Sequence, residues 1–284
     1  YQKIGYGSGD IAGNVVYALL TAFVMFYLTD MVGLSMGIIG TLIALSKVFD
    51  GVTDFFFGRM IDKTHTKMGK ARPWMLWPYI GCSVALVACF AIPTSWGQTA
   101  QYAFFFIAYT LLNAVFFTAN NIAYASLTAL ITKNTNERVQ LGSIRFIFAF
   151  GTSMLIQYIT IDAVNWFGGG AEGWRIVAII YAIVGLIINT ISVFSVKELP
   201  EADKEIEKER KEEHTLTFFD SFKLLLKNKY YVIICITYIM TQLYASVIGM
   251  GIYYMKYILG NEGLFSDFAL AINIPMVAML LILP

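Results

Sequence analysis

Three charged residues interrupt a long apolar stretch of the sequence that runs from about Gly37 to Phe57. They are Lys47, Asp50 and Asp54. In a helix, at 100° per residue, Lys47 and Asp54 lie about 20° apart around the axis, and Asp50 lies about 40° from Asp54. One base and two acids therefore share one face of a segment that reaches the roughly 20 residues needed to cross a bilayer.

A charge at the centre of a membrane costs roughly 2.5–3.5 kcal/mol on insertion scales, so a charge kept there needs a partner or a function. Lys47 can pair with Asp50 or Asp54, which leaves one carboxylate that needs a proton or a metal cation. We therefore predict a site for a coupling cation, Na⁺ or H⁺, at Asp50 and Asp54. The alternative is that the ion pair serves only to hold helices together.

A second group of polar residues falls in other apolar segments and suits a solute rich in hydroxyl groups. Asp10 and Asn14 lie four residues apart near the N-terminus, and Asn121 and Tyr124 lie three apart further along the chain. Amides donate and accept hydrogen bonds, as sugar hydroxyls do, and Arg145 adds a planar fork of donors. Two alternatives stay open, because the amides can instead join helices and Arg145 can extend to the membrane surface.

The composition indicates that a membrane surrounds the elements that position these residues. Of the 284 residues, 58% are hydrophobic and 14% are charged, and the mean hydropathy is +0.66. This apolar share is well above that of a soluble domain and predicts an all-α polytopic membrane protein. We expect eight membrane-spanning helices, the last of them incomplete in a truncated chain, at about 11–33, 36–58, 73–94, 100–127, 144–166, 175–196, 230–255 and 265–284.

Lysine and arginine cluster in alternate loops, which predicts how the chain is oriented. The basic loops are 59–72, 128–145 and 197–229, and the turns between the other spans hold at most one basic residue. Because cytoplasmic loops carry the excess of basic residues, we place these loops and the N-terminus in the cytoplasm. The segment Glu198–His214 has charges of alternating sign, and we expect a solvated, partly helical linker there.

Several motifs resemble the glycoside–pentoside–hexuronide:cation symporter family, whose best-known member is the melibiose:sodium symporter. The similarity covers nearly all of residues 1–200 and is less distinct beyond. The motifs are G-x-G-D-x-x-x-N at Gly7–Asn14, Y-L-T-D-x-x-G-L at Tyr27–Leu34, K-x-x-D-G-x-x-D at Lys47–Asp54, D-x-T-x-x-K-x-G-K-x-R-P-W at Asp62–Trp74 and N-E-R-x-x-L-x-x-x-R at Asn136–Arg145.

The resemblance implies a major-facilitator fold of two six-helix bundles, with the substrate bound between them at mid-membrane and alternating access to the two sides. The expected divisions are an N-terminal bundle at 1–197, a cytoplasmic charged linker at 198–229 and the start of a C-terminal bundle at 230–284. About four further helices would complete the second bundle. No cofactor is implied apart from the coupling cation.

The loop between the second and third spans resembles the superfamily's signature for that loop. In the family, its glycine, here Gly58, permits close helix packing. Asp62, with the basic residues Lys70 and Arg72, would latch the closed cytoplasmic side.

Three residues match the family's cation site, and a fourth departs from it. Asp50 and Asp54 match its cation-binding carboxylates, and Thr118 matches a hydroxyl beside them. Thr53 stands where the melibiose symporter has an asparagine that tunes cation choice, so Na⁺ and H⁺ both remain open as the coupling cation.

The substrate side departs from the melibiose symporter. Asn14 and Asn121 stand where that protein has sugar-binding aspartates, Gly13 replaces a neighbouring lysine, and Arg145 matches the family's substrate-side arginine after a one-residue gap. Exchanging two acceptor-only carboxylates for amides should change the substrate. With two fewer negative charges beside Arg145, we hypothesise that an anionic glycoside such as a hexuronide is accommodated.

Together these features predict a secondary active transporter and not an enzyme. The expected activity is cation-coupled symport of a glycoside, pentoside or hexuronide across the inner (plasma) membrane, with no nucleic-acid partner. An uncoupled sugar facilitator and a non-transporting sensor or scaffold are the alternatives. An intramembrane aspartyl protease is a further one because Gly7–Asp10 spells G-x-G-D, although the Tyr-Asp partner that such catalysis needs is missing from a preceding helix.

Overall fold

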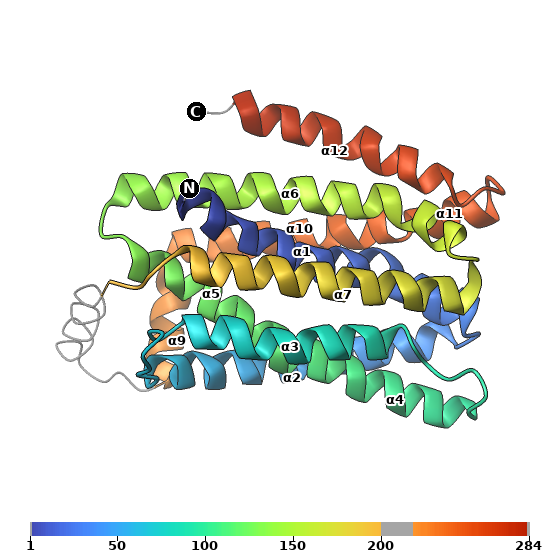
Figure 1. Ribbon diagram of the computed structural model, residues 1–284, viewed down its shortest axis with the longest axis horizontal. Coiled ribbons are helices and arrows are strands. Elements are labelled where there is room, and N and C mark those ends of the chain that lie inside the picture. The colour runs from blue at the N-terminus through green and yellow to red at the C-terminus, as the bar shows by residue number, and fades with distance from the viewer. Residues whose placement is uncertain (1, 200–217, 283–284) are drawn as a thin grey trace.

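The structure is a computed structural model that describes residues 2–199 and 218–282, and all regular elements in these residues are helices. Most of the helices run side by side along the long axis of the molecule (Figure 1). This arrangement confirms the predicted all-α fold. The helices are α1 (Gln2–Phe26), η1 (Tyr27–Met31), α2 (Met36–Asp62), α3 (Arg72–Cys89), α4 (Gln98–Thr110), η2 (Leu111–Phe117), α5 (Thr118–Ile131), α6 (Thr135–Trp166), α7 (Gly170–Ser195), α9 (Phe218–Lys227), α10 (Lys229–Gly249), α11 (Gly251–Tyr257) and α12 (Leu264–Ile282).

Each of the eight predicted spans coincides with one helix or with consecutive helices. Six helical segments in the described part of the chain are long and apolar enough to cross a membrane, and α3 and α12 are not among them. The count of eight therefore stays a prediction. The helices α1 and α6 begin nine residues before the predicted spans, because hydropathy marks only the apolar part of a helix that continues into a polar end.

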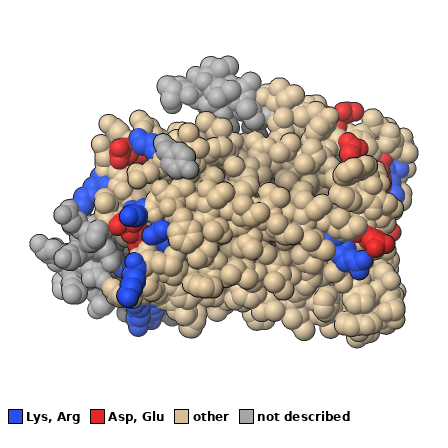
Figure 2. Space-filling model, viewed as in Figure 1, with Lys and Arg blue, Asp and Glu red and all other residues tan. Residues whose placement is uncertain are grey.

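The distribution of charge on the surface also fits a membrane protein. On the face shown in Figure 2, charged side chains gather at the two ends and a broad belt between them carries almost none. Large apolar side chains such as Val48, Val52 and Phe55 are exposed on α2. A belt of this kind suits the hydrocarbon core of a bilayer, which is about 30 Å thick.

The helix α1 holds the first part of the chain together. It packs against α6 and α7, α7 packs against α3, and α3 packs against α5 and η2. An aromatic cluster lies at the end of α1, where Trp174 is 1% exposed and its ring lies 5.5 Å from that of Phe23 and 6.0 Å from that of Phe90. This cluster and the aliphatic side chains of α1 form the main hydrophobic core.

Local sequence signals explain where several helices start. Asn134 and Asn228 accept hydrogen bonds from backbone N–H groups in the first turns of α6 and α10, as N-cap residues do. The turn between α6 and α7 is made by Gly168, Gly169 and Gly170, all with positive φ, a conformation that glycine adopts without strain. This short connection sets α6 and α7 side by side in opposite directions (Figure 1).

The second part of the chain is less enclosed. The helix α9 falls inside the predicted linker at 198–229, and residues 200–217 of that linker lie outside the described residues. No residue of α10 is buried within the described structure. α12 packs along α6, and α11 lies beside the end of α1 (Figure 1).

Candidate functional site

The carboxylate of Asp50 joins two helices at the predicted cation site. The Thr118 hydroxyl on α5 donates a hydrogen bond of 2.7 Å to Asp50 Oδ1, and Lys47 Nζ lies 3.1 Å from Asp50 Oδ2. The Asp50 side chain is 24% exposed and that of Lys47 is 52% exposed. Lys47 thus forms the predicted ion pair with Asp50. The pair lies beside the Thr118 hydroxyl, which the family resemblance had assigned to this site.

A π-helical turn presents Thr118 to Asp50. η2 ends at Phe117, and the backbone N–H and the hydroxyl of Thr118 both lie within hydrogen-bonding distance of the Asn113 carbonyl oxygen. Short π-helical turns inside α-helices often occur at functional sites. The hydroxyl has one proton, so it cannot bond fully to both Asp50 and Asn113 at once. Hydropathy and residue spacing give no sign of such a turn, and sequence analysis missed it.

The other two predicted cation ligands lie on the same helix as Asp50. The Thr53 hydroxyl donates to the carbonyl oxygens of Phe49 and Asp50, 3.0 Å from each. Asp54 follows one turn later, is exposed, and has no hydrogen-bond partner in the described residues. Carboxylate, hydroxyl and carbonyl oxygens are donors that suit a hard cation. In the described part of the chain, no cluster of three or more His, Cys, Asp or Glu residues could hold a metal ion.

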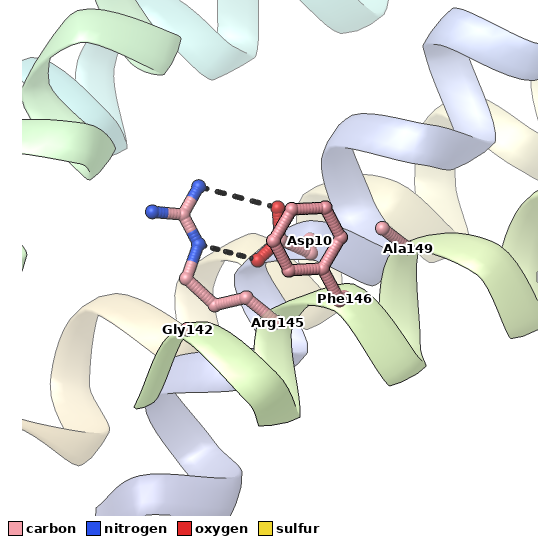
Figure 3. A pocket seen from close by; sticks show the side chains of 5 residues that line it. All are labelled: Asp10, Gly142, Arg145, Phe146 and Ala149. Atoms are coloured by element: carbon pink, nitrogen blue, oxygen red, sulfur yellow. Dashed lines mark hydrogen bonds and ion pairs between the residues drawn. The ribbon is translucent and has the colours of Figure 1, made fainter. Parts of the chain in front are cut away.

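A second charged cluster joins α1, α5 and α6. Arg145 Nε donates to Asp10 Oδ2 at 2.7 Å and Nη2 donates to Oδ1 at 3.4 Å, as Figure 3 shows. The Tyr124 hydroxyl donates to the same Oδ2 at 2.9 Å. The side chains of Arg145 and Asp10 are 24% and 15% exposed. In this structure Arg145 therefore bonds to a carboxylate of the bundle, and its predicted contact with substrate stays a prediction.

Two tyrosines support the Arg145 guanidinium. Its carbon lies 4.2 Å from the centre of the Tyr124 ring and 5.9 Å from that of Tyr6, distances at which a cation is attracted to an aromatic face. The Tyr6 hydroxyl in turn donates to the Tyr124 carbonyl oxygen at 3.0 Å. Beside this group lies a pocket of about 240 Å³, lined by Asp10, Gly142, Arg145, Phe146 and Ala149 (Figure 3).

The structure brings Asp10, Tyr124 and Arg145 together but leaves the two predicted amides at the edge. Asn14 donates to the Asp10 carbonyl oxygen at 2.8 Å, one turn along α1. Asn121 is exposed on α5, and neither amide lines the pocket. The predictions that Asn14 and Asn121 bind substrate therefore remain predictions.

The neighbouring amide, Asn120, has a structural role. Its side chain is 7% exposed and donates to the Met75 carbonyl oxygen at 2.6 Å and to Asn189 Oδ1 at 3.2 Å. Asn189 donates to the same Met75 oxygen at 2.9 Å. These bonds join α3, α5 and α7, so Asn120 holds helices together, whereas the adjacent Asn121 is exposed.

Residues of the predicted cytoplasmic latch lie at the end of α2 and around the start of α3. Arg72 Nε donates to the Val193 carbonyl oxygen at 2.8 Å and thereby caps the end of α7. Lys70 is buried and Asp62 is half-buried at the end of α2. A Cβ on Gly58 would meet no described atom within 4 Å. The described residues therefore show no close packing at Gly58, and its predicted role stays a prediction.

Sequence analysis missed Glu198, which it had assigned to the solvated linker. The Glu198 carboxylate accepts hydrogen bonds from the backbone N–H groups of Lys70, Ala71 and Arg72, at 2.6, 3.0 and 3.0 Å. These groups lie at the N-terminus of α3, where an anion is favoured by the unpaired N–H groups and by the helix dipole. The first residue of the predicted linker is thus an anchor for α3.

Comparison with known proteins agrees with this architecture. A model of the family described as MFS/sugar transport protein matches residues 5–284. The isoprimeverose transporter of Lactiplantibacillus pentosus is 35% identical over 202 residues, which are 69% of this chain and 42% of the transporter. The putative glycoside/cation symporter YagG of Escherichia coli is 31% identical over 273 residues, 95% of this chain and 57% of that protein.

A third relative differs in the substrate that its name gives. The glucuronide carrier protein homolog of Escherichia coli is 25% identical over 281 residues, which are 95% of this chain and 58% of that protein. The chain therefore spans about half the length of these curated relatives. The named relatives are transporters and none is an enzyme, which leaves no support for the aspartyl protease alternative.

Proposed function

Because this chain belongs to the MFS/sugar transport family, as its resemblance to the glycoside–pentoside–hexuronide:cation symporters indicated, we propose that the whole protein is a cation-coupled sugar symporter. The observation that carries the proposal is the Asp10–Arg145 pair, held by Tyr124 inside an apolar helix bundle and open to a pocket. A buried fork of donors beside acceptor oxygens and aromatic faces is chemistry that recognises a sugar.

The cluster around Asp50 is the proposed cation site. A cation or proton that enters would neutralise Asp50 and Asp54, which lie one helical turn apart on α2. Two like charges at that distance repel each other when the membrane excludes water, so a bound cation stabilises the pair. Thr118 then supplies a hydroxyl oxygen next to Asp50. Lys47 offsets one negative charge while the site is empty.

Coupling between the two sites would pass through α5. Thr118 contacts the cation site and Tyr124 contacts the sugar site. They lie six residues apart on one helix, a rise of about 9 Å. A displacement of α5 on cation binding would therefore also move Tyr124. A coupling free energy of about 1–3 kcal/mol would make each ligand favour binding of the other.

The choice between neutral and anionic substrates depends on Asp10. The hexuronide hypothesis counted two lost carboxylates beside Arg145, but Asp10 places one carboxylate directly on the guanidinium. A neutral glycoside would bind to this compensated pair through its hydroxyl groups. A hexuronide would need the unbonded edge of Arg145 for its carboxylate. Relatives are named for both kinds of substrate, so both belong in the test.

Uptake by the full-length protein in proteoliposomes tests this proposal. The comparison is between an inward sodium gradient, an inward proton gradient and no gradient, with a panel of neutral glycosides and uronides. We expect gradient-driven uptake of one substrate class, abolished by Asp54→Asn. The matched control is Asp162→Asn, which alters an exposed aspartate on α6.

Each outcome separates two alternatives. Uptake driven by protons alone would keep the site and identify the cation as H⁺. Uptake that ignores both gradients and survives Asp54→Asn would identify an uncoupled facilitator. No uptake of any sugar, with the variant indistinguishable from the parent, would favour a non-transporting sensor or scaffold.

A further inference from the structure

A nearly buried carboxylate is among the contacts between the first and second parts of the chain. Asp30 lies in η1, at the end of the first span, and its side chain is 5% exposed. Lys256 Nζ lies 2.8 Å from Asp30 Oδ1, and the Tyr257 hydroxyl donates to the same oxygen. Thr29 donates to Oδ2 at 2.8 Å. Two of the three donors thus come from α11, more than 200 residues later in the chain.

Aromatic side chains surround this pair. The Lys256 ammonium lies 4.7 Å from the centre of the Phe26 ring, and the Phe26 ring packs edge-on against Tyr253 with their centres 5.9 Å apart. The Tyr253 hydroxyl lies 3.0 Å from the Thr29 hydroxyl. Phe23 packs against Phe265 of α12 in the same way. The contact therefore combines a charge pair in low dielectric with a well-packed apolar surround.

This charged contact lies at one end of the molecule. The helix α11 is at the end opposite to the N-terminus and to the loop between α2 and α3 (Figure 1). Away from that end, α10 has no buried residue in the described structure. By the distribution of basic loops, the end that carries Asp30 is the outer one. The pocket beside Asp10 and Arg145 lies nearer the other end, on the early turns of α1 and α6.

We propose that Asp30 and Lys256 form the outer gate of the transporter, and that their ion pair, reinforced by Tyr257 and Phe26, holds the conformation closed to the outside. This inference rests on the proposed function, because a carrier that works by alternating access must separate its two halves at each end in turn. Separation exposes both charges to water. Removal of Lys256 leaves the nearly buried Asp30 without its cation, which is strongly unfavourable for the closed state, whereas Lys256 is 29% exposed and keeps Glu262 at 3.8 Å.

A cysteine placed between the gate and the sugar site reports on closure without any substrate. Thr21 lies on α1 between Asp10 and Asp30, is exposed, and its carbonyl oxygen is 3.5 Å from where a Cβ on Gly249 of α10 would stand. Thr21→Cys is introduced into the full-length protein after Cys82, Cys89 and Cys235 are replaced by serine. The rate of reaction with a membrane-impermeant thiol reagent, added from outside to proteoliposomes of known orientation, is then measured.

We expect Lys256→Gln to raise that rate about tenfold or more, because an unpaired Asp30 favours the open gate. Asp30→Asn should raise the rate less, because Lys256 keeps Glu262 as a partner. Exchange of the charges in Asp30→Lys with Lys256→Asp should bring the rate back toward that of the parent. The matched control is Arg175→Gln, which breaks an exposed ion pair with Glu172 at the same end of the molecule and should change nothing. Equal rates in the parent and both single variants would overturn the proposal.

A second measurement does not depend on removing a charge. Phe26→Cys with Tyr253→Cys, without the Thr21→Cys reporter, is joined by a short bis-thiosulfonate reagent that forms reducible disulfides. The cross-link should block uptake, and reductant should restore it. Uptake that is unchanged by the cross-link would also overturn the gate. Because labelling needs neither sugar nor cation, a gate that responds while no sugar is taken up would count against sugar as the substrate alone and leave the gate in place.

Discussion

Thr118 and Tyr124 stand on the same helix, α5, and each donates a hydrogen bond to a carboxylate on a different helix. Thr118 donates to Asp50 of α2 at 2.7 Å, and Tyr124 donates to Asp10 of α1 at 2.9 Å. The two charged clusters of the bundle are thus linked by one rigid element. Variants on either side of this link should separate cation binding from sugar binding.

Loss of the Thr118 hydroxyl should weaken binding of the cation. Thr118→Val keeps the volume and removes the bond to Asp50, a hydrogen bond to a charged group worth about 1.5–3 kcal/mol. We expect the sodium or proton concentration for half-maximal uptake to rise about tenfold or more. Cation-dependent uptake kinetics at fixed sugar measure this.

Thr110→Val is the matched control for that variant. The Thr110 hydroxyl lies on the same span, is buried, and has no hydrogen-bond partner in the described residues. Its removal breaks nothing and should leave cation dependence unchanged. A similar rise in both variants would show that valine disturbs this span in general and that the Asp50 contact has no special part in cation binding.

The planar shape of Arg145 should matter as much as its charge. Arg145→Lys keeps a cation but loses the two-point contact with Asp10 and the stacking on Tyr124, and lysine cannot replace arginine at such a site. We expect uptake to fall nearly as far as in Arg145→Gln. Measurement of sugar binding in the presence of the cation tests this, and near-normal binding by the lysine variant would contradict it.

Alanine at two adjacent asparagines should affect different properties of the protein, stability in one case and sugar affinity in the other. Asn120→Ala leaves the Met75 carbonyl without its shortest hydrogen bond and Asn189 Oδ1 without its donor, a cost of about 1–3 kcal/mol in a buried setting. We expect a clear loss of thermal stability in detergent. Asn121→Ala should keep the melting temperature of the parent and lower sugar affinity if Asn121 faces the substrate. Equal stability of the two variants would refute the structural role of Asn120.

These asparagines also mark the limit of sequence analysis. Hydropathy and residue spacing predicted the helices, the Lys47 ion pair and the polar faces of α1 and α5, because all of these depend on local periodicity. Which of two adjacent amides joins helices depends on the rotation of α5 against α3 and α7, and that rotation is set by packing. The π-helical turn η2 changes the rotation again just before Thr118.

The outer contact shows a second limit. Asp30 belongs to the motif at Tyr27–Leu34 that supports the family resemblance. The sequence around Asp30 does not indicate that Lys256 is its partner. Contacts between residues so far apart in the chain arise only when the helices are assembled. Glu198 was missed for the same reason, since a charged segment looks like a solvated linker until its first residue is seen to bind the N-terminus of α3.

The effects of substituting Glu198 and Gly69 on stability should be coupled, because Gly69 leaves space for the Glu198 carboxylate. Gly69 has a φ of +110°, and a Cβ there would lie 2.4 Å from the Glu198 carboxylate carbon. Gly69→Ala therefore strains the backbone and displaces the carboxylate, while Glu198→Ala removes the acceptor for three N–H groups. We expect each variant to lower the melting temperature in detergent, and the double variant to lose less than the sum of the two, because both break one contact.

Gly97→Ala is the control for this pair of variants. Gly97 lies in another loop, with a φ of −64° and no described atom within 4 Å of a Cβ, so alanine there should leave the melting temperature unchanged. Glu198→Gln keeps one acceptor oxygen without the charge and should fall between the parent and Glu198→Ala, since part of the stabilisation is the attraction of a carboxylate to the N-terminus of α3. Strictly additive losses in the double variant would show that Gly69 and Glu198 act separately, and α3 would then be held by other contacts.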